Sequence, residues 1–374
     1  MTLYTVFYIY GIVWKYMKNK ILYVTKDTER AQSLAQDNTY EILSSEGTKS
    51  TLDILKDQEN IKKIKNGKYS VLVFKNNIQI ENIAKENNFE ILNPKAELSE
   101  MIENKITQVT WLKELENLLP EHSLVLGKDI VWKEKPFILQ WAHSHTGEGT
   151  YLINSEKELK TIVSSFPNRQ ARVTEYIKGP MFTLNIVISK NRILLGNISY
   201  QITGMLPFTE NMMSTIGNDW SVPPSILTDL QIEEIKSIAN KIGQKMKDSG
   251  WKGLFGIDVI YDEQRDKIFL IEINARQPAS TTYESEIQKM NRNEGIKGIT
   301  IFEAHIKALK DEDINEDVIE INDGAQIIKR VTKKDFAIDT NTLKDNGYNI
   351  IKYNNTKLNS DEFRIQSIMG IMET

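Results

Sequence analysis

The feature that most constrains the fold is a pair of apolar segments joined by a short polar turn. The segments "KGLFGIDVIYD" (252–262) and "KIFLIEINA" (267–275) are rich in Ile, Leu, Phe and Val, and the polar turn "DEQRD" joins them. This pattern predicts an antiparallel β-hairpin that turns near Gln264. In that register Asp258 pairs near Leu270, and Glu272 is its diagonal neighbour on the same face.

Polar residues follow the apolar core of the second strand at every second position. Side chains alternate along a strand, so Glu272, Asn274 and Arg276 share one face. Burying a charge costs several kcal/mol unless the charge is paired or binds an ion. Carboxylate and amide oxygens suit Mg²⁺, which commonly also binds substrate phosphates. The hairpin therefore predicts a metal–phosphate site, with Arg276 on a phosphate oxygen. Spacing alone supports a solvent-exposed strand end with a surface ion pair equally well.

Composition excludes several classes of protein. The chain has 374 residues, enough for two or three domains, and a net charge of −4 from 47 Lys and Arg against 51 Asp and Glu. A general nucleic-acid binder would be basic, so we expect no nucleic-acid partner. There is no cysteine, which excludes disulfides, a thiolate nucleophile and cysteine-bound metal. This composition fits a reducing cytoplasm, which is the location we expect.

The N-terminal segment carries an apolar run, Leu3–Trp14, that is about 12 residues long. A bilayer-spanning helix needs roughly 20 residues. No basic residue precedes the run and no small-residue cleavage site follows it, so it is a poor signal peptide. We expect residues 1–16 to be a non-native or flexible extension, with the working protein beginning at Met17. The alternative is an N-terminal anchor that touches a membrane, although we expect no membrane contact.

The order of elements predicts several domains. Strands alternate with helices from Ile21 to about Asn93, which favours a parallel sheet with crossover helices. A long helical pattern covers 96–116, and strands surrounding the capped helix at Ser155 indicate a small α+β unit. The expected divisions are 1–16, 17–100 (an α/β domain), 101–128 (a connecting helix region), 129–177, 178–310 and 311–374 (an α+β segment).

Four segments in this order resemble the ATP-grasp superfamily. The hairpin is similar to the family's metal-binding hairpin, which implies Asp258, Glu272 and Asn274 as ligands and Arg276 as support for the transferred phosphate. Residues 174–188 resemble the hinge that holds adenine, and 93–112 resemble the helix with the first ATP-binding lysine. "ILQWAHSHTGEGT" resembles the lid's glycine-rich phosphate loop. The implied nucleotide-binding residues are Lys105, Gln140, His145, Gly147, Gly149, Glu175, Tyr176 and Ile177.

The resemblance implies a fold of the α/β and α+β classes. It consists of a parallel-sheet preATP domain, a small α+β lid at 129–177 and an antiparallel-sheet core at 178–310. Two positions depart from the family pattern. Gln140 stands where a second lysine is usual, and Lys133 or Lys135 could compensate; Met181 stands where many relatives have a ribose-binding Glu.

The histidines of "HSH" at 143–145 have two interpretations. With no third ligand nearby in sequence, we favour lid-loop residues near phosphate over metal ligands. His145 is the better candidate for a phosphate contact, because its glycine neighbours leave backbone N–H groups free to donate. A plain hairpin turn is the alternative.

The resemblance implies an ATP-grasp carboxylate–amine ligase that uses ATP with Mg²⁺ or Mn²⁺. Arg276 and Lys105 are its implied catalytic residues, and its partners are a small carboxylate and a small amine. Two alternatives remain within the family: a carboxylase- or phosphotransferase-type enzyme, and a nucleotide-binding protein without activity. A non-nucleotide α/β binding protein is a third, and a homodimer is also open. The sequence does not identify the acid or the amine.

Overall fold

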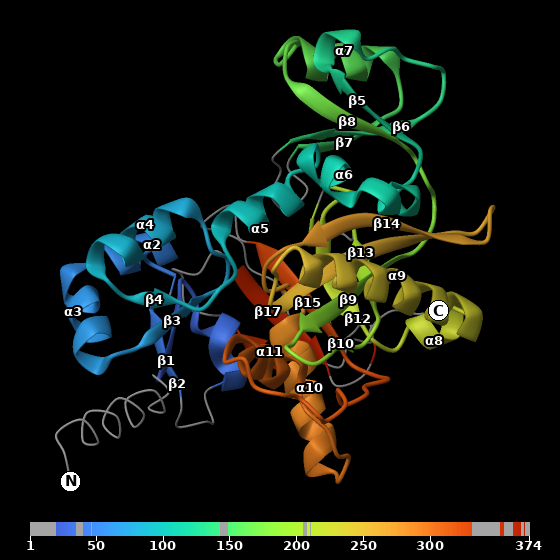
Figure 1. Ribbon diagram of the computed structural model, residues 1–374. Coiled ribbons are helices and arrows are strands. Elements are labelled where there is room, and N and C mark those ends of the chain that lie inside the picture. Colours follow the sequence, from blue (N-terminus) through green and yellow to red (C-terminus); the bar gives the residue numbers. More distant parts are fainter. Residues whose placement is uncertain are drawn as a thin grey trace, which may run out of the picture. The chain divides into compact units, whose positions relative to one another are not determined.

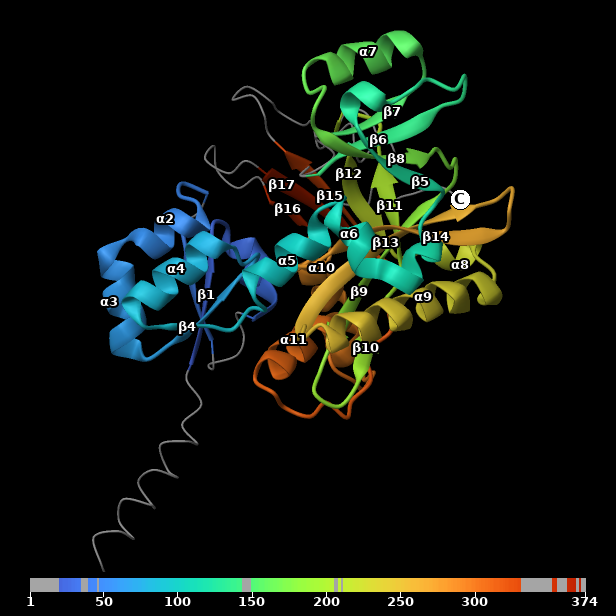
Figure 2. The same ribbon diagram turned by 45° about the horizontal axis from the view of Figure 1, so that its top comes forward.

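The computed structural model describes residues 20–34, 40–45, 47–142, 149–204, 208–209, 211–330, 352–354, 362–367 and 370 (Figures 1 and 2). The extension at 1–16 and the loop residues His143, His145 and Gly147 lie outside these ranges. The chain divides into two compact units. The first comprises residues 1–74 and 78–93, and the second comprises 75–77 and 94–374.

The first unit is a parallel sheet with helices. Its strand order is β2 (Tyr40–Ser44), β1 (Ile21–Thr25), β3 (Ser70–Val73) and β4 (Glu90–Ile91), and all pairs are parallel. The helical elements are η1 (Thr28–Leu34), α2 (Thr51–Lys56), α3 (Gln58–Gly67) and α4 (Ile78–Asn87). Apolar side chains from β1, β3, α2, α3 and α4 form one core. The predicted α/β architecture is confirmed.

The second unit contains a nine-stranded antiparallel sheet. In order across the sheet, its strands are β14 (Lys267–Asn274), β13 (Gly253–Asp262), β9 (Met181–Ile188), β11 (Ser199–Thr203), β12 (Thr215–Asp219), β15 (Ala325–Arg330), β17 (Glu362–Ser367) and β16 (Lys352–Asn354), while β10 (Ile193–Leu195) pairs with β9. The associated helices are α8 (Pro223–Ile226), α9 (Asp229–Asp248), α10 (Thr281–Asn293) and α11 (Ile301–Leu309). The predicted antiparallel core is confirmed.

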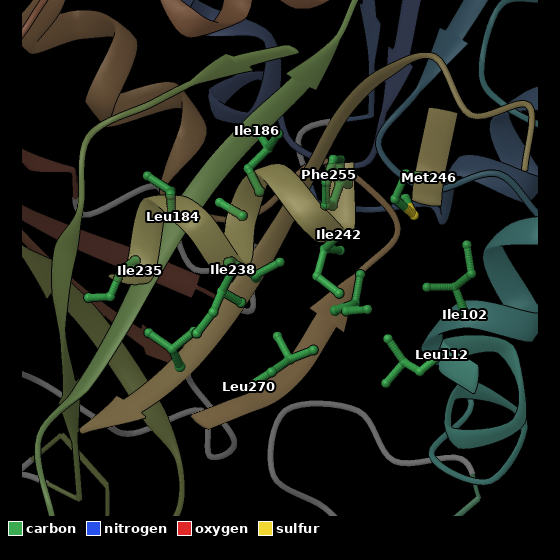
Figure 3. Packing of buried hydrophobic residues seen from close by; sticks show 14 of the residues in the cluster. Ile102, Leu112, Leu184, Ile186, Ile235, Ile238, Ile242, Met246, Phe255 and Leu270 are labelled. Atoms are coloured by element: carbon green, nitrogen blue, oxygen red, sulfur yellow. The ribbon is translucent and has the colours of Figure 1, made fainter. Parts of the chain in front are cut away.

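The main core of this unit lies between helix α9 and one face of the sheet. Figure 3 shows Ile235, Ile238, Ile242 and Met246 of α9 beside side chains from β9, β13 and β14. Alternate residues of β9, such as Leu184 and Ile186, point into this core. The residues between them point to the opposite face, which is therefore available for polar groups.

A smaller four-stranded sheet forms the lid. Its order is β5 (His122–Leu126), β8 (Gln170–Glu175), β6 (Phe137–Trp141) and β7 (Thr150–Ile153), with helix α7 (Glu156–Ser164) packed on one face. Short 3₁₀ turns, η2 (Lys113–Leu118) and η3 (Gly127–Asp129), flank β5. Strand β5 lies before residue 129, where we expected the lid to begin. The predicted small α+β lid is confirmed.

The single long helix expected over 96–116 was wrong. Helix α5 (Ala96–Glu103) ends at Asn104, and helix α6 (Thr107–Leu112) begins three residues later. The Asn104 side chain causes this break, because its Oδ1 accepts from the backbone N–H of Ile106 at 2.9 Å. Such local bonds compete with helix continuation. The break leaves Lys105 between the two helices instead of on one.

The predicted register of the hairpin was also wrong. Asp258 lies directly opposite Glu272, and Val259 lies opposite Leu270, so Ile271 is an extra residue in β14. This β-bulge reverses the alternation: Ile268 and Leu270 point into the main core before it, whereas Ile273 and Ala275 do so after it. The bulge lets Glu272 face Asp258 while the rest of β14 keeps its apolar side chains in the core.

Among the described residues, no helix is long and apolar enough to cross a membrane.

We expect Ile242→Ala to lower the free energy of unfolding of the second unit by about 2–5 kcal/mol, since it leaves a cavity in a well-packed core. Ile242 is fully buried, whereas Leu230 on the same helix is 84% exposed. Leu230→Ala should therefore change stability by less than about 0.5 kcal/mol. Urea unfolding of both variants checks this, and equal losses would contradict the packing described.

Candidate active site

Two carboxylates face each other across strands β13 and β14. Asp258 and Glu272 are direct cross-strand partners. Asp258 Oδ2 accepts from Asn274 Nδ2 at 3.0 Å, and its Oδ1 accepts from the Thr183 hydroxyl at 2.7 Å. The hairpin and β9 therefore position the three predicted metal ligands together. Sequence reasoning missed Thr183, although its alternation with the apolar residues of β9 could have indicated it.

The two carboxylates respond differently to burial. Burial, together with the charge of Glu272, raises the pKa of Asp258 to about 6, although bonds from Thr183 and Asn274 oppose this shift. Burial also acts to raise the pKa of Glu272, but the charge and hydrogen bond of Lys105, together with the charges of Arg276 and Arg172, outweigh it, so that pKa is lowered. The two carboxylates therefore repel each other where water is largely excluded, and a cation placed between them would offset this repulsion.

Lys105 forms a buried ion pair with Glu272. Its Nζ lies 2.6 Å from Glu272 Oε1, and its side chain is 3% exposed against 34% for Glu272. Burial lowers the pKa of Lys105 although the charge of Glu272 opposes this. Its backbone N–H donates to the Ala142 carbonyl at 3.1 Å. The helix break therefore places the Lys105 ammonium group beside Glu272, where its backbone also contacts the lid.

Arg276 lies just beyond β14 and pairs with a different carboxylate. Its Nε is 3.2 Å from Glu103 Oε1, at the end of helix α5, and Lys75 also pairs with Glu103. The charge of Arg276 contributes to the lowered pKa of Glu272. The Ser99 hydroxyl donates to the Ala275 carbonyl at 2.6 Å, which fixes α5 to this strand end. Arg276 is thus held at the edge of the carboxylate pair.

A second buried cation comes from the lid. Arg172 on β8 is 3% exposed and directly opposite Gln140 on β6. Gln140 Oε1 accepts from Nε at 3.0 Å and from Nη2 at 2.7 Å. Sequence reasoning missed Arg172, yet a charge inside the apolar strand "QARVTEYI" is the same signal that identified Glu272.

Polar side chains continue from Asp258 across the sheet. Gln201 Nε2 donates to the Thr183 hydroxyl at 2.6 Å, and Gln201 Oε1 accepts from Thr215 at 3.1 Å. Asn218, opposite Gln201 on β12, donates to the Ser199 hydroxyl at 3.0 Å. These buried neutral groups form a surface beside the carboxylates that sequence patterns did not indicate.

The predicted hinge residues lie at and after the end of β8. Glu175 Oε1 accepts from the Glu121 N–H and from Arg265 Nη1, both at 3.0 Å. Tyr176 is 39% exposed, whereas Ile177 packs against Ile260 and Phe269. This small apolar cluster lies on the same face of the hairpin as Asp258. The base-binding roles of these residues stay predictions.

The predicted phosphate loop is described only at its end. Gly149 has φ +87°, a conformation that favours glycine, and its carbonyl accepts from the Trp141 N–H at 3.0 Å. Gly149 therefore closes the turn between β6 and β7. Lys133 and Lys135 are both exposed, in the segment before β6.

Comparison with known proteins identifies the domain that carries this site. Residues 102–280 match the family model described as "ATP-grasp domain". These residues form an ATP-grasp domain. The match includes Lys105, the lid, and the whole hairpin with its carboxylates, and it confirms the family predicted from the sequence. No curated protein matches the chain.

Solved structures share the ATP-grasp fold over most of the chain. N5-carboxyaminoimidazole synthase from Aspergillus clavatus, in complex with ADP and 5-aminoimidazole ribonucleotide, has 16% identity and a TM-score of 0.67, covering 95% of each chain. N5-carboxyaminoimidazole synthetase from Staphylococcus aureus has 16% identity and a TM-score of 0.65, covering 93% of each. At these identities the likeness shows the fold alone.

A third structure is the biotin carboxylase domain of Hydrogenobacter thermophilus 2-oxoglutarate carboxylase, in complex with MgADP, ADP and bicarbonate. It has 14% identity and a TM-score of 0.59, and the match covers 83% of this chain and 74% of that one. The ATP-grasp fold of this chain is therefore shared by proteins whose titles name different substrates.

Asp258→Asn should stabilise the metal-free protein at neutral pH. The folded-state pKa of about 6 lies above the ordinary 3.8, so the stability associated with Asp258 is present below pH 4 and lost as pH rises through 6. Asn does not titrate. We therefore expect the variant to gain on the order of 2 kcal/mol relative to wild type between pH 4 and pH 7.

Urea unfolding without divalent cations, at pH 4, 5, 6 and 7, measures this difference. A difference between the two proteins that does not change with pH would contradict the raised pKa of Asp258.

Proposed function

We propose that this chain is an ATP- and Mg²⁺-dependent ligase that joins a carboxylate to an amine through an acylphosphate. The observation that carries this proposal is the pair Asp258–Glu272, which face each other across the hairpin with Lys105 2.6 Å from Glu272. Such an arrangement of hard oxygens and cations suits a metal-bound nucleotide. The ADP complexes of proteins with the same fold support it.

The donor set fits a divalent cation of the Mg²⁺ or Mn²⁺ type. Burial and repulsion by the charge of Glu272 raise the pKa of Asp258, and a bound cation would offset both effects. Lys105 contacts Glu272 Oε1, which leaves Oε2 for a metal. Asp258, Glu272 and the Asn274 amide oxygen would hold the ion, which supplies charge neutralisation of the nucleotide phosphates when bound.

The reaction then has two steps. A carboxylate oxygen of the substrate forms a bond to the γ-phosphorus, the bond to the bridging oxygen breaks, and ADP leaves. The amine nitrogen next bonds to the acyl carbon, phosphate leaves, and the nitrogen loses a proton. Lys105 and Arg276 would offset the negative charge on the transferred phosphoryl group, and catalysis of this step is mostly positioning.

The lid and the hinge would complete the nucleotide site. We assign Glu175 and the backbone of Tyr176 and Ile177 to the base, with the cluster around Ile177 supplying an apolar surface for it. His145, Gly147 and Gly149 would lie over the phosphates and exclude water from the acylphosphate. Glu175 already binds Arg265, so base recognition through its side chain would require that ion pair to be shared.

The acid and the amine are proposed as small molecules. Bicarbonate is one candidate acid, since it is named in the complex of the biotin carboxylase domain. If bicarbonate is the acid, the carboxylase-type enzyme considered from the sequence stays an alternative. Use of ATP supports the cytoplasm as the compartment, and a homodimer stays a prediction.

Calorimetric titration of a non-hydrolysable ATP analogue with Mg²⁺ tests the nucleotide site. Glu272→Ala should weaken binding by at least tenfold, because it removes a metal ligand and leaves Lys105 buried without its partner. Glu263→Ala is the matched control, since Glu263 is an exposed carboxylate in the turn of the same hairpin. It should bind as wild type does.

If wild type binds, phosphate release is then screened over acids, including bicarbonate, paired with amines. Release that depends on both an acid and an amine supports the ligase. Release without an amine favours the carboxylase or phosphotransferase alternative, and no binding by wild type would contradict the proposal.

A further inference from the structure

The lid contributes the buried guanidinium of Arg172, whose hydrogen bonds go to neutral oxygens instead of to a carboxylate. Besides its two bonds to Gln140, Arg172 donates from Nη1 to Gln108 Oε1 at 3.2 Å and from Nη2 to the Ile271 carbonyl at 3.2 Å. In the described part of the chain, the oxygens within hydrogen-bond distance of Arg172 are thus two amides and one carbonyl. All of them are neutral.

A buried cation whose contacts are all neutral has no opposite charge beside it to offset the cost of its burial. Burial lowers the pKa of Arg172 to about 10, because the surroundings solvate the charged guanidinium less well than water does. Glu272 is the anion that opposes this shift, but its Oε1 is already paired with Lys105. Buried charges in proteins are normally paired or bind a ligand. The site therefore has a positive charge in the lid that an anionic ligand would balance.

The geometry also holds Arg172 in a fixed orientation. The lid sheet has an apolar face against α7, formed by residues such as Leu139, Trp141 and Ala171. Gln140 and Arg172 alternate with those residues and lie on the opposite face, where they meet Ile271 of the core hairpin. A guanidinium held on two sides loses little conformational entropy when it binds phosphate oxygens.

We propose that Arg172 is the phosphate-binding cation of the lid, and that Gln140 positions it instead of contacting the nucleotide itself. This inference rests on the proposed nucleotide site and deepens it. It also assigns the role for which Lys133 and Lys135 were considered, since both are exposed in the segment before β6 while Arg172 is buried beside the carboxylates. The ligand chemistry is a phosphate oxyanion of a nucleotide.

The test compares ADP with adenosine, both in the presence of Mg²⁺, by calorimetry. Arg172→Gln should weaken ADP binding by about tenfold or more and leave adenosine binding within about twofold, because only ADP carries the phosphates. Arg172→Lys keeps the charge and should lose less. Lys133→Gln is the control for a lid cation and should bind both ligands as wild type does.

A second variant moves the positive charge of the lid from strand β8 to the neighbouring strand β6. Because Gln140 and Arg172 are direct cross-strand partners, the double variant Gln140→Lys, Arg172→Gln places a cation at the neighbouring position on the same face. It should recover at least a third of the ADP affinity lost by Arg172→Gln. A purely structural role for Arg172 would not be rescued in this way.

Three results would overturn the inference. Arg172→Gln could bind ADP as tightly as wild type; it could lose ADP and adenosine equally; or the double variant could show no recovery although it folds. If Arg172→Gln does not fold, Arg172→Lys decides: ADP affinity lost with adenosine affinity unchanged supports the inference, and equal loss of both, or loss of neither, overturns it. Failure of wild type to bind ADP would instead overturn the proposed function, and this inference with it.

Discussion

The buried ion pair between Lys105 and Glu272 is the contact on which the site depends. It joins two segments that are distant in sequence, the break between helices α5 and α6 and the end of strand β14. The attraction between the two charges is stronger here than in water, and removal of Glu272 would leave the Lys105 charge buried. Lys105 contributes most to the lowering of the pKa of Glu272, while burial and the charge of Glu272 raise the pKa of Asp258.

Charged side chains of both signs lie around this pair. Arg276 pairs with Glu103 and Lys105 pairs with Glu272, whereas the hydrogen bonds to Asp258 come from the neutral Thr183 and Asn274. The sheet face next to Asp258 continues with amides and hydroxyls, which neither neutralise a carboxylate nor repel one. Two carboxylates that repel each other thus lie among several cations, an arrangement that suits a metal ion bound together with anionic phosphates.

Much of the fold and of the carboxylate site could be predicted from the sequence, because both leave strong local patterns. The alternation of side chains along a strand placed Asp258, Glu272 and Asn274 together, and the alternation of strands with helices indicated the parallel sheet of the first unit. The bulge at Ile271 could not be predicted, since it depends on how β13 and β14 pack against the core rather than on local pattern. The helix break at Asn104 was missed for a different reason: a side-chain bond to the Ile106 N–H overrides a continuous apolar pattern. Arg172 was missed although the rule that identified Glu272 applies to it.

The bulge has a mechanical consequence. An extra residue in one strand has no partner residue opposite it in the ladder, and the Ile271 carbonyl accepts instead from Arg172 of the lid. A movement of the lid away from the hairpin would have to break this bond, because Arg172 belongs to β8 and Ile271 to β14. The irregularity in β14 thus adds one hydrogen bond to the contacts that hold the lid against the core. Where a lid movement limits turnover, such contacts contribute to its rate.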